Sequence, residues 1–372
     1  MKQRLLIFEL RMIGDAILSL PFIRAAQEQF EVYVACAPSS LDIFEMVLPR
    51  ARIISWEPPW LSDKGKYTPR RWIGSGMWDF IGKVFSVRAH TVVSVWPDAR
   101  THILMTLSGA KKRVGFPMVK INYWGIHLPW RRRQLQFGTM LSAIASTLLL
   151  RSLLTKKVIR ADYYQHHTYN WRQLANTLGL RLDISPPWLR LPPAKLPADV
   201  EAFISKARDE RQLIWLVHPG ARIPHRRWPL KHFKMVIKRK LLTAGAAVIL
   251  VEPPEMKIGR QVDNGVLVTK LKDLRALMKL TNLVNYVLCN DSAIAQFAAA
   301  LGKQAVVIYT ANTPHLFIPS DSIDLAVENN ACSYKPCLDQ CVMPSFVCRD
   351  AVTVTEVEAK LQLLVSATHK PL

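Results

Sequence analysis

The sequence predicts an α/β protein made of two doubly wound halves. Three observations predict this fold class: a length of 372 residues, short apolar runs that alternate with helix-like segments, and a proline-rich break after which the alternation starts again. A domain usually takes roughly 100–200 residues, so the chain is long enough for two. Half of its residues are apolar and only 21% are charged, which excludes intrinsic disorder. We therefore expect a domain at 1–182, a linker at 183–197 and a second domain at 198–372.

The first half begins with a buried strand. Residues 5–10 form a short apolar run of the strand type, and the apolar spacing of residues 16–30 suits a helix. The other elements predicted in this half are strands at 32–36, 52–56, 91–97 and 112–116 and a helix at 39–48. Strands that alternate with helices imply βαβ units and a mostly parallel sheet.

Proline marks the linker. Residues 183–197 are so rich in it that they form neither a regular helix nor a central strand. Beyond them we predict helices at 198–207, 231–245, 271–280, 292–302 and 355–365 and strands at 213–220, 246–254, 286–291 and 305–310. In doubly wound folds ligands bind at the carboxyl ends of the strands, so residues that follow strands are the first candidates for a site.

Positive charge is concentrated in the first half. The chain has 50 basic and 28 acidic residues, a net charge of +22, and residues 64–172 alone carry 19 basic and 3 acidic residues. Residues 304–372 carry 4 basic and 7 acidic ones. A field of this sign raises the local concentration of anionic partners: nucleic acid, an anionic membrane surface, or a phosphorylated or carboxylated substrate. The alternative is that the basic residues serve solubility alone.

Motifs of several enzyme classes are missing from the sequence. There is no P-loop, no G-x-G-x-x-G after a strand, no G-x-S-x-G elbow and no H-E-x-x-H. His166 and His167 lie in a polar segment with no carboxylate in metal-ligand register, so we expect them on the surface. The last four cysteines are spaced more loosely than a paired zinc motif, and we expect reduced thiols, with a structural metal site as the alternative: Cys332, Cys337, Cys341 and Cys348.

No targeting segment is recognisable. Charged residues interrupt the apolar start of the chain, and no small-residue cleavage site follows. The most apolar later stretch, 137–154, is broken by Arg151 and lies near the short limit for spanning a bilayer. We expect a buried or surface-seated helix there and a cytoplasmic protein.

Gly14 and Asp15 come directly after the first predicted strand. Glycine lets the backbone turn tightly, and the start of the next helix presents unpaired N–H groups. Capping of that helix is the simplest interpretation of Asp15. A carboxylate in a cleft between two domains would instead serve as a general base.

Three further groups follow strands of the second half: Gly220 with Arg222 and Arg226, Glu255, and Asp291 with Ser292. The first combines a glycine turn with a basic loop, a layout that binds anions through backbone donors and arginine side chains. A solvated basic loop is the alternative. The second places an acidic residue where it can hold a ribose, and the third starts a helix, where capping alone would explain it. Together they suggest a nucleotide on the second half and an acceptor on the first.

These segments, in this order, resemble the glycosyltransferase family 9 heptosyltransferases. The matching stretches are IGDAILSLPFIRA, HPGARIPHRRWPLKHF, VILVEPPE, NDSAIAQFAAALG and the cysteine-containing tail. The resemblance implies a GT-B fold, with two Rossmann-like domains facing across a cleft. It also implies an inverting, metal-independent transfer from an ADP-heptose donor, without a cofactor. The implied acceptor is an anionic, lipid A-anchored core sugar of lipopolysaccharide.

The resemblance also implies roles for individual residues. Asp15 matches the family's catalytic base, and Arg226 falls at the basic position that stabilises the departing diphosphate. The implied donor-binding residues are Gly220, Arg222, Glu255, Asp291, Ser292 and Gln296. Basic residues that flank Tyr67, Trp72, Trp124 and Trp130 suit a surface meeting anionic lipid and the acceptor. With Gly14, the acceptor-binding candidates are Lys64, Arg70, Arg71, Arg131 and Arg132.

The chain departs from the family at one motif. Where the family commonly has D-[ST]-G-x-x-H, this sequence has Ala293 in place of the glycine and Gln296 in place of the histidine. Alanine resists the backbone conformations that glycine allows, while glutamine still offers an amide N–H. Two alternatives therefore stay open: a family relative that uses another nucleotide sugar, and a non-catalytic basic protein that binds a glycan or nucleic acid.

The partners expected from the resemblance are the nucleotide sugar, the anionic acceptor and the inner face of the inner membrane. The basic, tryptophan-containing composition of the first half would also suit RNA. However, the sequence has no RNA-binding motif such as RNP1, so nucleic acid is not expected.

Overall fold

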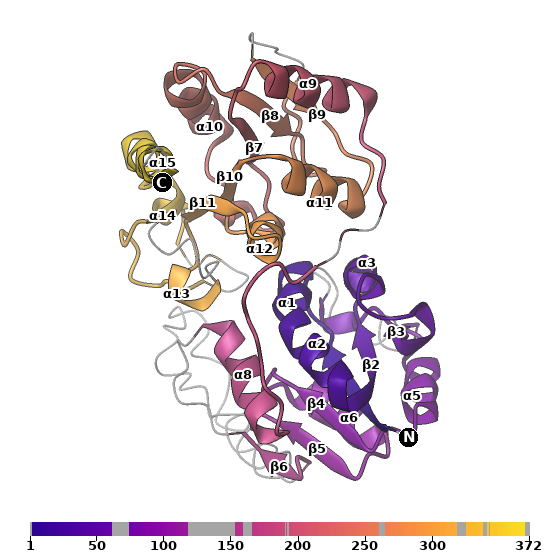
Figure 1. The fold of residues 1–372 in the computed structure, drawn as a ribbon. Coiled ribbons are helices and arrows are strands. Elements are labelled where there is room, and N and C mark those ends of the chain that lie inside the picture. Colours follow the sequence, from indigo (N-terminus) through magenta and orange to yellow (C-terminus); the bar gives the residue numbers. More distant parts are fainter. Residues whose placement is uncertain are drawn as a thin grey trace. The chain divides into compact units, whose positions relative to one another are not determined.

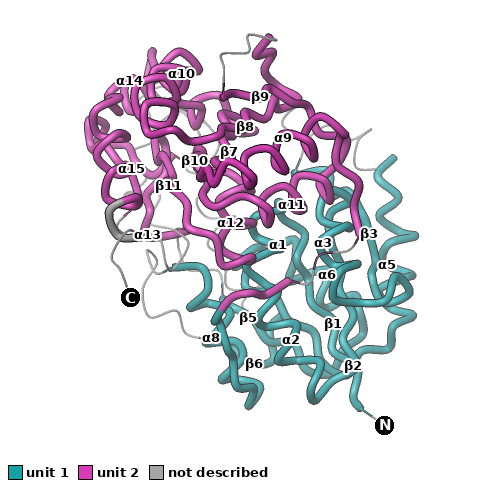
Figure 2. Tube along the Cα trace, turned by 45° about the horizontal axis from the view of Figure 1, so that its top comes forward, with its two compact units in different colours: residues 1–185 teal, residues 186–372 magenta. Residues whose placement is uncertain are grey.

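The computed structural model describes residues 2–61, 74–117, 153–158, 166–189, 191, 193–259, 265–317, 325–337, 341 and 343–368. The chain forms two compact units, unit 1 at 1–185 and unit 2 at 186–372 (Figure 2). Each unit is built on one six-stranded parallel sheet with helices on its faces (Figure 1). The predicted α/β class with two doubly wound sheets is therefore confirmed.

Unit 1 contains strands β1 (Gln3–Glu9), β2 (Phe30–Cys36), β3 (Ile53–Ser55), β4 (Thr91–Ser94), β5 (Lys112–Gly115) and β6 (Lys156–Lys157). Its helices are α1 (Ile13–Leu18), α2 (Leu20–Gln29), α3 (Leu41–Glu45), α5 (Met77–Ser86), α6 (Ala99–Leu107) and α8 (His167–Thr177). The strand order is β3-β2-β1-β4-β5-β6. The chain thus extends the sheet outward from β1 in one direction and then, from β4, in the other.

Both faces of β1 are buried, because successive side chains of a strand point to opposite faces. Leu6 and Phe8 belong to a core cluster that includes residues of α5 and α6. On the side of α2 and α8, Phe22 packs against Trp171 with ring centroids 5.0 Å apart. The order of strands reverses between β1 and β4, which in doubly wound sheets is the place where ligands bind.

Unit 2 repeats the topology. Its strands are β7 (Ile214–His218), β8 (Ala247–Val251), β9 (Val266–Thr269), β10 (Tyr286–Asn290), β11 (Gln304–Tyr309) and β12 (Ala326–Glu328). Its helices are α9 (Ala198–Asp209), α10 (Leu230–Val236) continued by a π-helical turn (Ile237–Leu241), α11 (Leu274–Leu283), α12 (Ala293–Ala300), α13 (Pro314–Phe317), α14 (Val347–Asp350) and α15 (Val354–Thr368). The strand order is β12-β11-β10-β7-β8-β9, so the reversal lies between β7 and β10.

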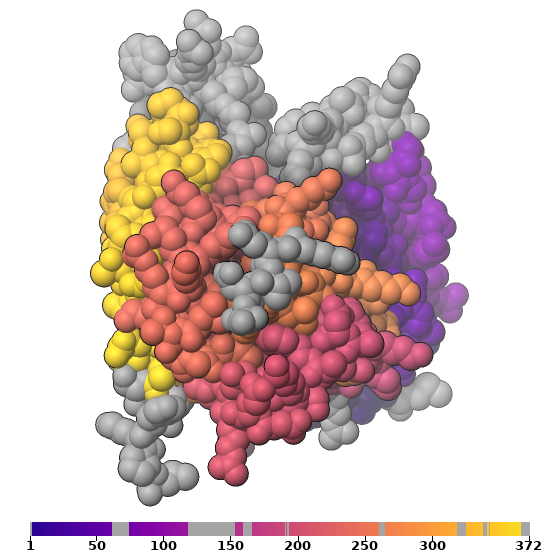
Figure 3. All heavy atoms as spheres, turned by 90° about the horizontal axis from the view of Figure 1, so that it is seen from above, coloured from indigo at the N-terminus to yellow at the C-terminus, as the bar shows by residue number. Residues whose placement is uncertain are grey.

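The last helix completes the core of unit 2. Figures 1 and 3 show α15, in yellow, beside α10. Leu361 and Leu364 of α15 join the buried cluster that contains Phe233 and Val236 of α10. Trp228, fully buried just before α10, donates its indole N–H to the carbonyl of Val352 at 2.8 Å. This contact ties the start of α10 to the end of the chain.

Every strand predicted from an apolar run is present, but the structure differs in detail. The helix predicted at 16–30 is two helices, α1 and α2, that meet at Ser19; Pro21 follows and has no N–H for the ladder. Three edge strands, β6, β9 and β12, were not predicted, because runs of two to four residues carry too little pattern. The edge strand β3 was predicted from the longer run 52–56. Within 183–197, the described residues form neither helix nor strand.

The apolar stretch predicted at 137–154 lies mostly outside the described residues, which here begin at Leu153. Among the helices that the structure does describe, none combines the length and the apolar character needed to cross a bilayer.

Candidate functional site

In unit 2, the reversal point of the sheet is bridged by one buried side chain. Asn290 is the last residue of β10 and is fully buried. Its amide nitrogen donates to the carbonyl of Pro219 at 2.7 Å, and its oxygen accepts the backbone N–H of Trp228 at 3.0 Å. Asn290 therefore fixes both ends of the loop from Pro219 to Trp228, which carries the glycine turn and the arginines.

The glycine of this loop sits where no side chain fits. A Cβ on Gly220 would lie 2.6 Å from Cβ of Pro253, 2.8 Å from Oε1 of Glu255 and 2.8 Å from Cε1 of His218. The structure thus brings Gly220 and Glu255 together, although 35 residues separate them in the sequence. Burial lowers the pKa of His218, with an opposing effect from the charge of Glu255, so this ring is neutral at pH 7.

Gly220→Ala should destabilise the protein by about 1–3 kcal/mol, because the added methyl group meets the rigid ring of Pro253. Chemical denaturation measures this loss of unfolding free energy. Gly82→Ala is the matched control: Gly82 lies in α5 with nothing within 4 Å of an added Cβ, and we expect a gain of about 0.5–1 kcal/mol there. Equal stability of the two variants would show that Gly220 is not needed for packing.

Arg226 and Asp291 form an ion pair at the end of the basic loop. Nη1 of Arg226 lies 3.5 Å from Oδ2 of Asp291, and the Asp291 side chain is only 8% exposed. Asn312 donates to the same carboxylate oxygen at 3.2 Å. Thr310, which follows β11, donates its hydroxyl to the carbonyl of His225 on the basic loop at 2.7 Å. Asn312 and Thr310 were not singled out from the sequence, because each follows β11 without a recognisable motif.

Ser292 begins α12 but does not cap it. It occupies the N-cap position, yet its side chain makes no capping hydrogen bond. Its Oγ is buried, and among the described residues it has no hydrogen-bond partner; the same holds for Oδ1 of Asn312. Because buried polar atoms are nearly always paired, each of these two atoms is available to a partner outside the described residues. Capping therefore does not explain Ser292.

The other residues predicted to bind the donor differ in their exposure and in their contacts. Arg222 and Glu255 are exposed. Gln296 is 4% exposed, and its amide nitrogen donates to the carbonyl of Phe317. One of the two N–H groups of that nitrogen, which the sequence predicts to bind the donor, is thus used within unit 2. Ala293 forms the first turn of α12.

In unit 1, Asp15 follows β1 at the corresponding reversal point. It lies in the first turn of α1, is half-buried, and its Oδ2 accepts the backbone N–H of Met12 at 3.4 Å. Gly14 lies inside the same helical turn, so the tight turn that we expected at Gly14 is formed earlier, before Ile13. The capping contact and the role of a base are compatible, because a carboxylate keeps further lone pairs.

A second carboxylate, not predicted from the sequence, lies beside Asp15. Glu9 ends β1, is fully buried, and accepts the indole N–H of Trp96 at 3.2 Å. Burial raises the pKa of the Glu9 carboxyl well above its usual range; the charge of Asp15 adds to the rise, and the indole hydrogen bond opposes it. Glu9 lies in an apolar run that is typical of a buried core strand, so the sequence did not indicate a functional carboxylate there.

The surface position expected for His167 is wrong. His167 is 3% exposed and stacks on Trp96 with ring centroids 4.6 Å apart. Its neighbour His166 caps α8 by accepting the N–H of Thr168. The polar letters around them belong to an amphipathic helix whose inner face carries Trp171, which explains the error.

The predicted acceptor-binding residues of the basic loops lie outside the described residues: Lys64, Arg70, Arg71, Arg131 and Arg132. The six cysteines are free thiols. Burial raises the pKa of Cys337 to about 11, with smaller contributions from its three neighbouring cysteines, so this thiol is protonated at neutral pH. In the part of the chain that the structure describes, no group of His, Cys, Asp or Glu side chains is arranged to hold a metal ion.

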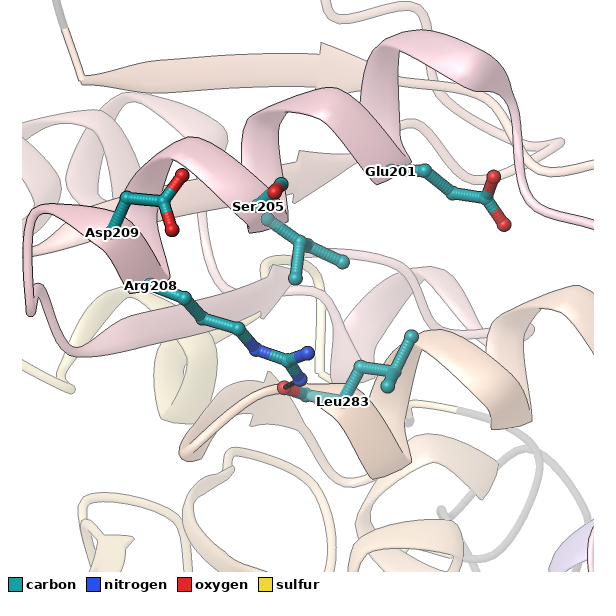
Figure 4. A pocket seen from close by; sticks show the side chains of 6 residues that line it. Glu201, Ser205, Arg208, Asp209 and Leu283 are labelled. Atoms are coloured by element: carbon teal, nitrogen blue, oxygen red, sulfur yellow. Dashed lines mark hydrogen bonds between the residues drawn. The ribbon is translucent and has the colours of Figure 1, made fainter.

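A shallow depression elsewhere on unit 2 does not belong to the site. Figure 4 shows it between α9, which contributes Glu201, Ser205, Arg208 and Asp209, and the end of α11 at Leu283. Arg208 closes it by donating to the carbonyl of Leu283 at 3.1 Å. The ends of α9 and α11 lead into the amino ends of β7 and β10, whereas ligands of doubly wound sheets bind at the carboxyl ends.

A sequence model described as glycosyltransferase family 9 (heptosyltransferase) matches residues 143–346, more than half of the chain. No curated protein sequence matches it. Among solved structures, the E. coli heptosyltransferase WaaC with ADP is 15% identical with a TM-score of 0.64, over 97% of this chain and 99% of that one. A family 9 glycosyl transferase from Veillonella parvula DSM 2008 is 16% identical with a TM-score of 0.61, over 98% of each chain. E. coli ADP-heptose lps heptosyltransferase II is 14% identical with a TM-score of 0.57, over 99% of each.

Proposed function

Because the chain belongs to glycosyltransferase family 9, the heptosyltransferase family, we propose that it transfers heptose from ADP-heptose to the inner core of lipopolysaccharide. Its two doubly wound sheets and its likeness to solved heptosyltransferases identify the fold as GT-B, as the sequence resemblance implied. One observation carries the choice of a phosphate-bearing donor: at the carboxyl ends of β7, β10 and β11, Arg226 lies beside Asp291 while the hydroxyl of Ser292 is buried and unpartnered within the described residues.

The donor is assigned to unit 2. The loop held by Asn290 supplies backbone N–H groups for the diphosphate, and its Gly220 packs closely against Pro253, Glu255 and His218 because it has no side chain. Arg222 and Arg226 supply positive charge for the diphosphate, and Glu255, exposed at the end of β8, is placed for a ribose hydroxyl. A solved complex of WaaC with ADP-2-deoxy-2-fluoro heptose supports a donor of this kind for a chain of this fold.

Asp15 is the proposed general base. Its carboxylate takes the proton of an acceptor hydroxyl while that oxygen forms a bond to the anomeric carbon of the donor sugar. The bond between the anomeric carbon and the diphosphate oxygen breaks on the opposite face, so the configuration at that carbon inverts. ADP leaves with the electron pair of the broken bond. Arg226 stabilises the added charge, which is the task that a metal ion performs in other enzymes, so the proposal needs neither metal nor cofactor.

The acceptor is assigned to unit 1 and to the inner face of the inner membrane. Unit 1 contains the segment with the local charge excess, 19 basic against 3 acidic residues in 64–172, which favours an anionic lipid A-anchored substrate. Binding of the protein to anionic vesicles should therefore weaken as salt is added.

A transfer assay tests the whole proposal. We expect the wild-type protein, incubated with ADP-heptose and a heptose-less core lipid, to add the mass of one heptose to the lipid, as read by mass spectrometry. ADP binding without transfer would favour a different sugar or acceptor, for which Ala293 and Gln296 are the residues to exchange. Failure to bind any nucleotide would contradict the enzyme and favour a non-catalytic basic binding protein.

A further inference from the structure

Unit 1 holds a cation beside Asp15 to which the proposed reaction gives no role. Arg11 lies in the turn between β1 and α1, at the reversal point of the sheet. Its guanidinium lies over the indole ring of Trp96, with Cζ 4.4 Å from the ring centroid. The side chain is 34% exposed, so it reaches the surface while one face is covered by the ring.

Several contacts hold Arg11 and Trp96 in this position. The buried carboxylate of Glu9 accepts the indole N–H of Trp96 and a backbone hydrogen bond from Arg11. His167 stacks on the indole and comes from α8, so a third element fixes the ring. The face of a tryptophan ring attracts a guanidinium stacked on it. The arginine is therefore placed before any ligand arrives, which reduces the entropy lost on binding.

The pairing of Asp98 leaves N–H donors of Arg11 available to an anion. Asp98 lies 3.7 Å from Nη2 of Arg11 but binds Arg100 more closely, at 2.6 and 2.9 Å. Burial would raise the pKa of Asp98, but the hydrogen bonds and charge of Arg100 and the charge of Arg11 lower it overall. Two guanidiniums thus share one ionised carboxylate. The contact from Arg11 is longer than a hydrogen bond, so its N–H groups can bind another acceptor atom.

We propose that Arg11 binds a carboxylate or phosphate group of the sugar acceptor, with Trp96 and Asp98 acting as positioning residues for its guanidinium. The inference rests on the proposed function, because it assumes that the acceptor binds at the same strand ends as Asp15. A guanidinium fits either anion through two parallel N–H donors. Arg11 then orients the acceptor next to the base, and contributes to the preference for anionic core sugars.

Arg11→Ala, compared with wild type on three acceptors, tests this site. The probes are the heptose-less core lipid, the same lipid with its carboxylates methyl-esterified, and the same lipid with its phosphates removed. On the unmodified lipid we expect the variant to raise the acceptor KM about 10–100-fold, the usual effect of losing a charged hydrogen bond. On the acceptor that lacks the recognised anion, wild type and variant should have the same KM, and that acceptor identifies the anion. The KM of Arg11→Lys for the unmodified lipid should fall between those of wild type and Arg11→Ala, because lysine keeps the positive charge but lacks the two parallel N–H donors of a guanidinium.

Arg4→Ala is the matched control. Arg4 also stacks on an aromatic ring, with Cζ 5.9 Å from Tyr33, and also pairs with a carboxylate, Glu31, at 3.2 Å. Its side chain is 43% exposed, but it lies at the amino end of β1. Its substitution should leave the KM for all three acceptors unchanged. A rise equal to that of Arg11→Ala would show a general charge effect and overturn the proposal.

Equilibrium binding of the three lipids, measured beside the rates, separates this inference from the function. Suppose that the wild-type protein binds the unmodified lipid more tightly than the lipid without the recognised anion, and that Arg11→Ala binds the two equally. The anion site then stands even if no heptose is transferred. If transfer occurs and Arg11→Ala loses the same factor on all three lipids, the transferase stands and the anion site is overturned. If the wild type binds none of them, both fail.

Discussion

Asp15→Asn should lower the rate of heptose transfer by about 10²–10⁴-fold and leave ADP affinity unchanged. Asparagine nearly reproduces the shape of aspartate but cannot take up the proton of the acceptor hydroxyl. ADP affinity should be insensitive because the nucleotide is assigned to unit 2, whereas Asp15 belongs to unit 1. Initial rates at saturating donor and acceptor, together with calorimetric titration of ADP, measure the two quantities.

Helix capping is the competing explanation for Asp15, and Asp42→Asn controls for it. Asp42 lies in the first turn of α3, after β2, just as Asp15 lies in the first turn of α1, after β1. Each substitution should cost about 0.3–1 kcal/mol of unfolding free energy, because a negative charge is lost near a helix N-terminus. Only Asp15→Asn should lose activity. If both variants keep their activity, the carboxylate of Asp15 only stabilises its helix.

Arg226→Ala should lower kcat by about 10²–10³-fold. The guanidinium is proposed to stabilise the charge that grows on the diphosphate as the glycosidic bond breaks, a contribution that strengthens in the transition state and therefore acts on kcat. Arg226→Lys should retain most of the activity, because it keeps the charge and loses only the second donor. Pre-steady-state rates of ADP release would show the effect on bond cleavage directly.

The ion pair with Asp291 has to be separated from this effect. Removing Arg226 leaves the carboxylate of Asp291 buried without its charge partner at 3.5 Å, which destabilises the fold by itself. Asp291→Asn breaks the same pair while keeping the arginine. Arg239→Ala removes an equally charged but exposed residue of unit 2. A loss of kcat no larger in Arg226→Ala than in Asp291→Asn would assign Arg226 to structure alone.

Local sequence pattern predicted the central strands and the edge strand β3, but not the edge strands β6, β9 and β12. Strands such as β1 and β10 are covered on both faces, so their side chains form continuous apolar runs that stand out along the chain. The edge strands β9 and β12 have three or four residues and partly exposed positions. They pair because a neighbouring strand is already present, and a short window of sequence does not contain that neighbour.

Some residues of the candidate site could be found from local sequence, and others only from the structure. Asp15, Gly220, Arg226 and Asp291 were singled out because they lie at the ends of predicted strands or in the loops that follow them, and the ends of parallel strands meet at one edge. Asn290, Thr310 and Asn312 act through contacts with residues far away in the sequence. The hydrogen bond from Asn290 to Pro219, for example, spans 71 residues.

The sequence by itself thus determined the fold class, the family and the strand ends to which we assign the chemistry, because these depend on local apolar runs and short motifs. Only the tertiary structure decided that Glu9 and His167 are buried around Trp96, that the hydroxyl of Ser292 does not cap its helix, and that Arg11 lies on an aromatic ring beside Asp15. Burial and pairing are properties of several elements packed together, and no single segment of sequence encodes them.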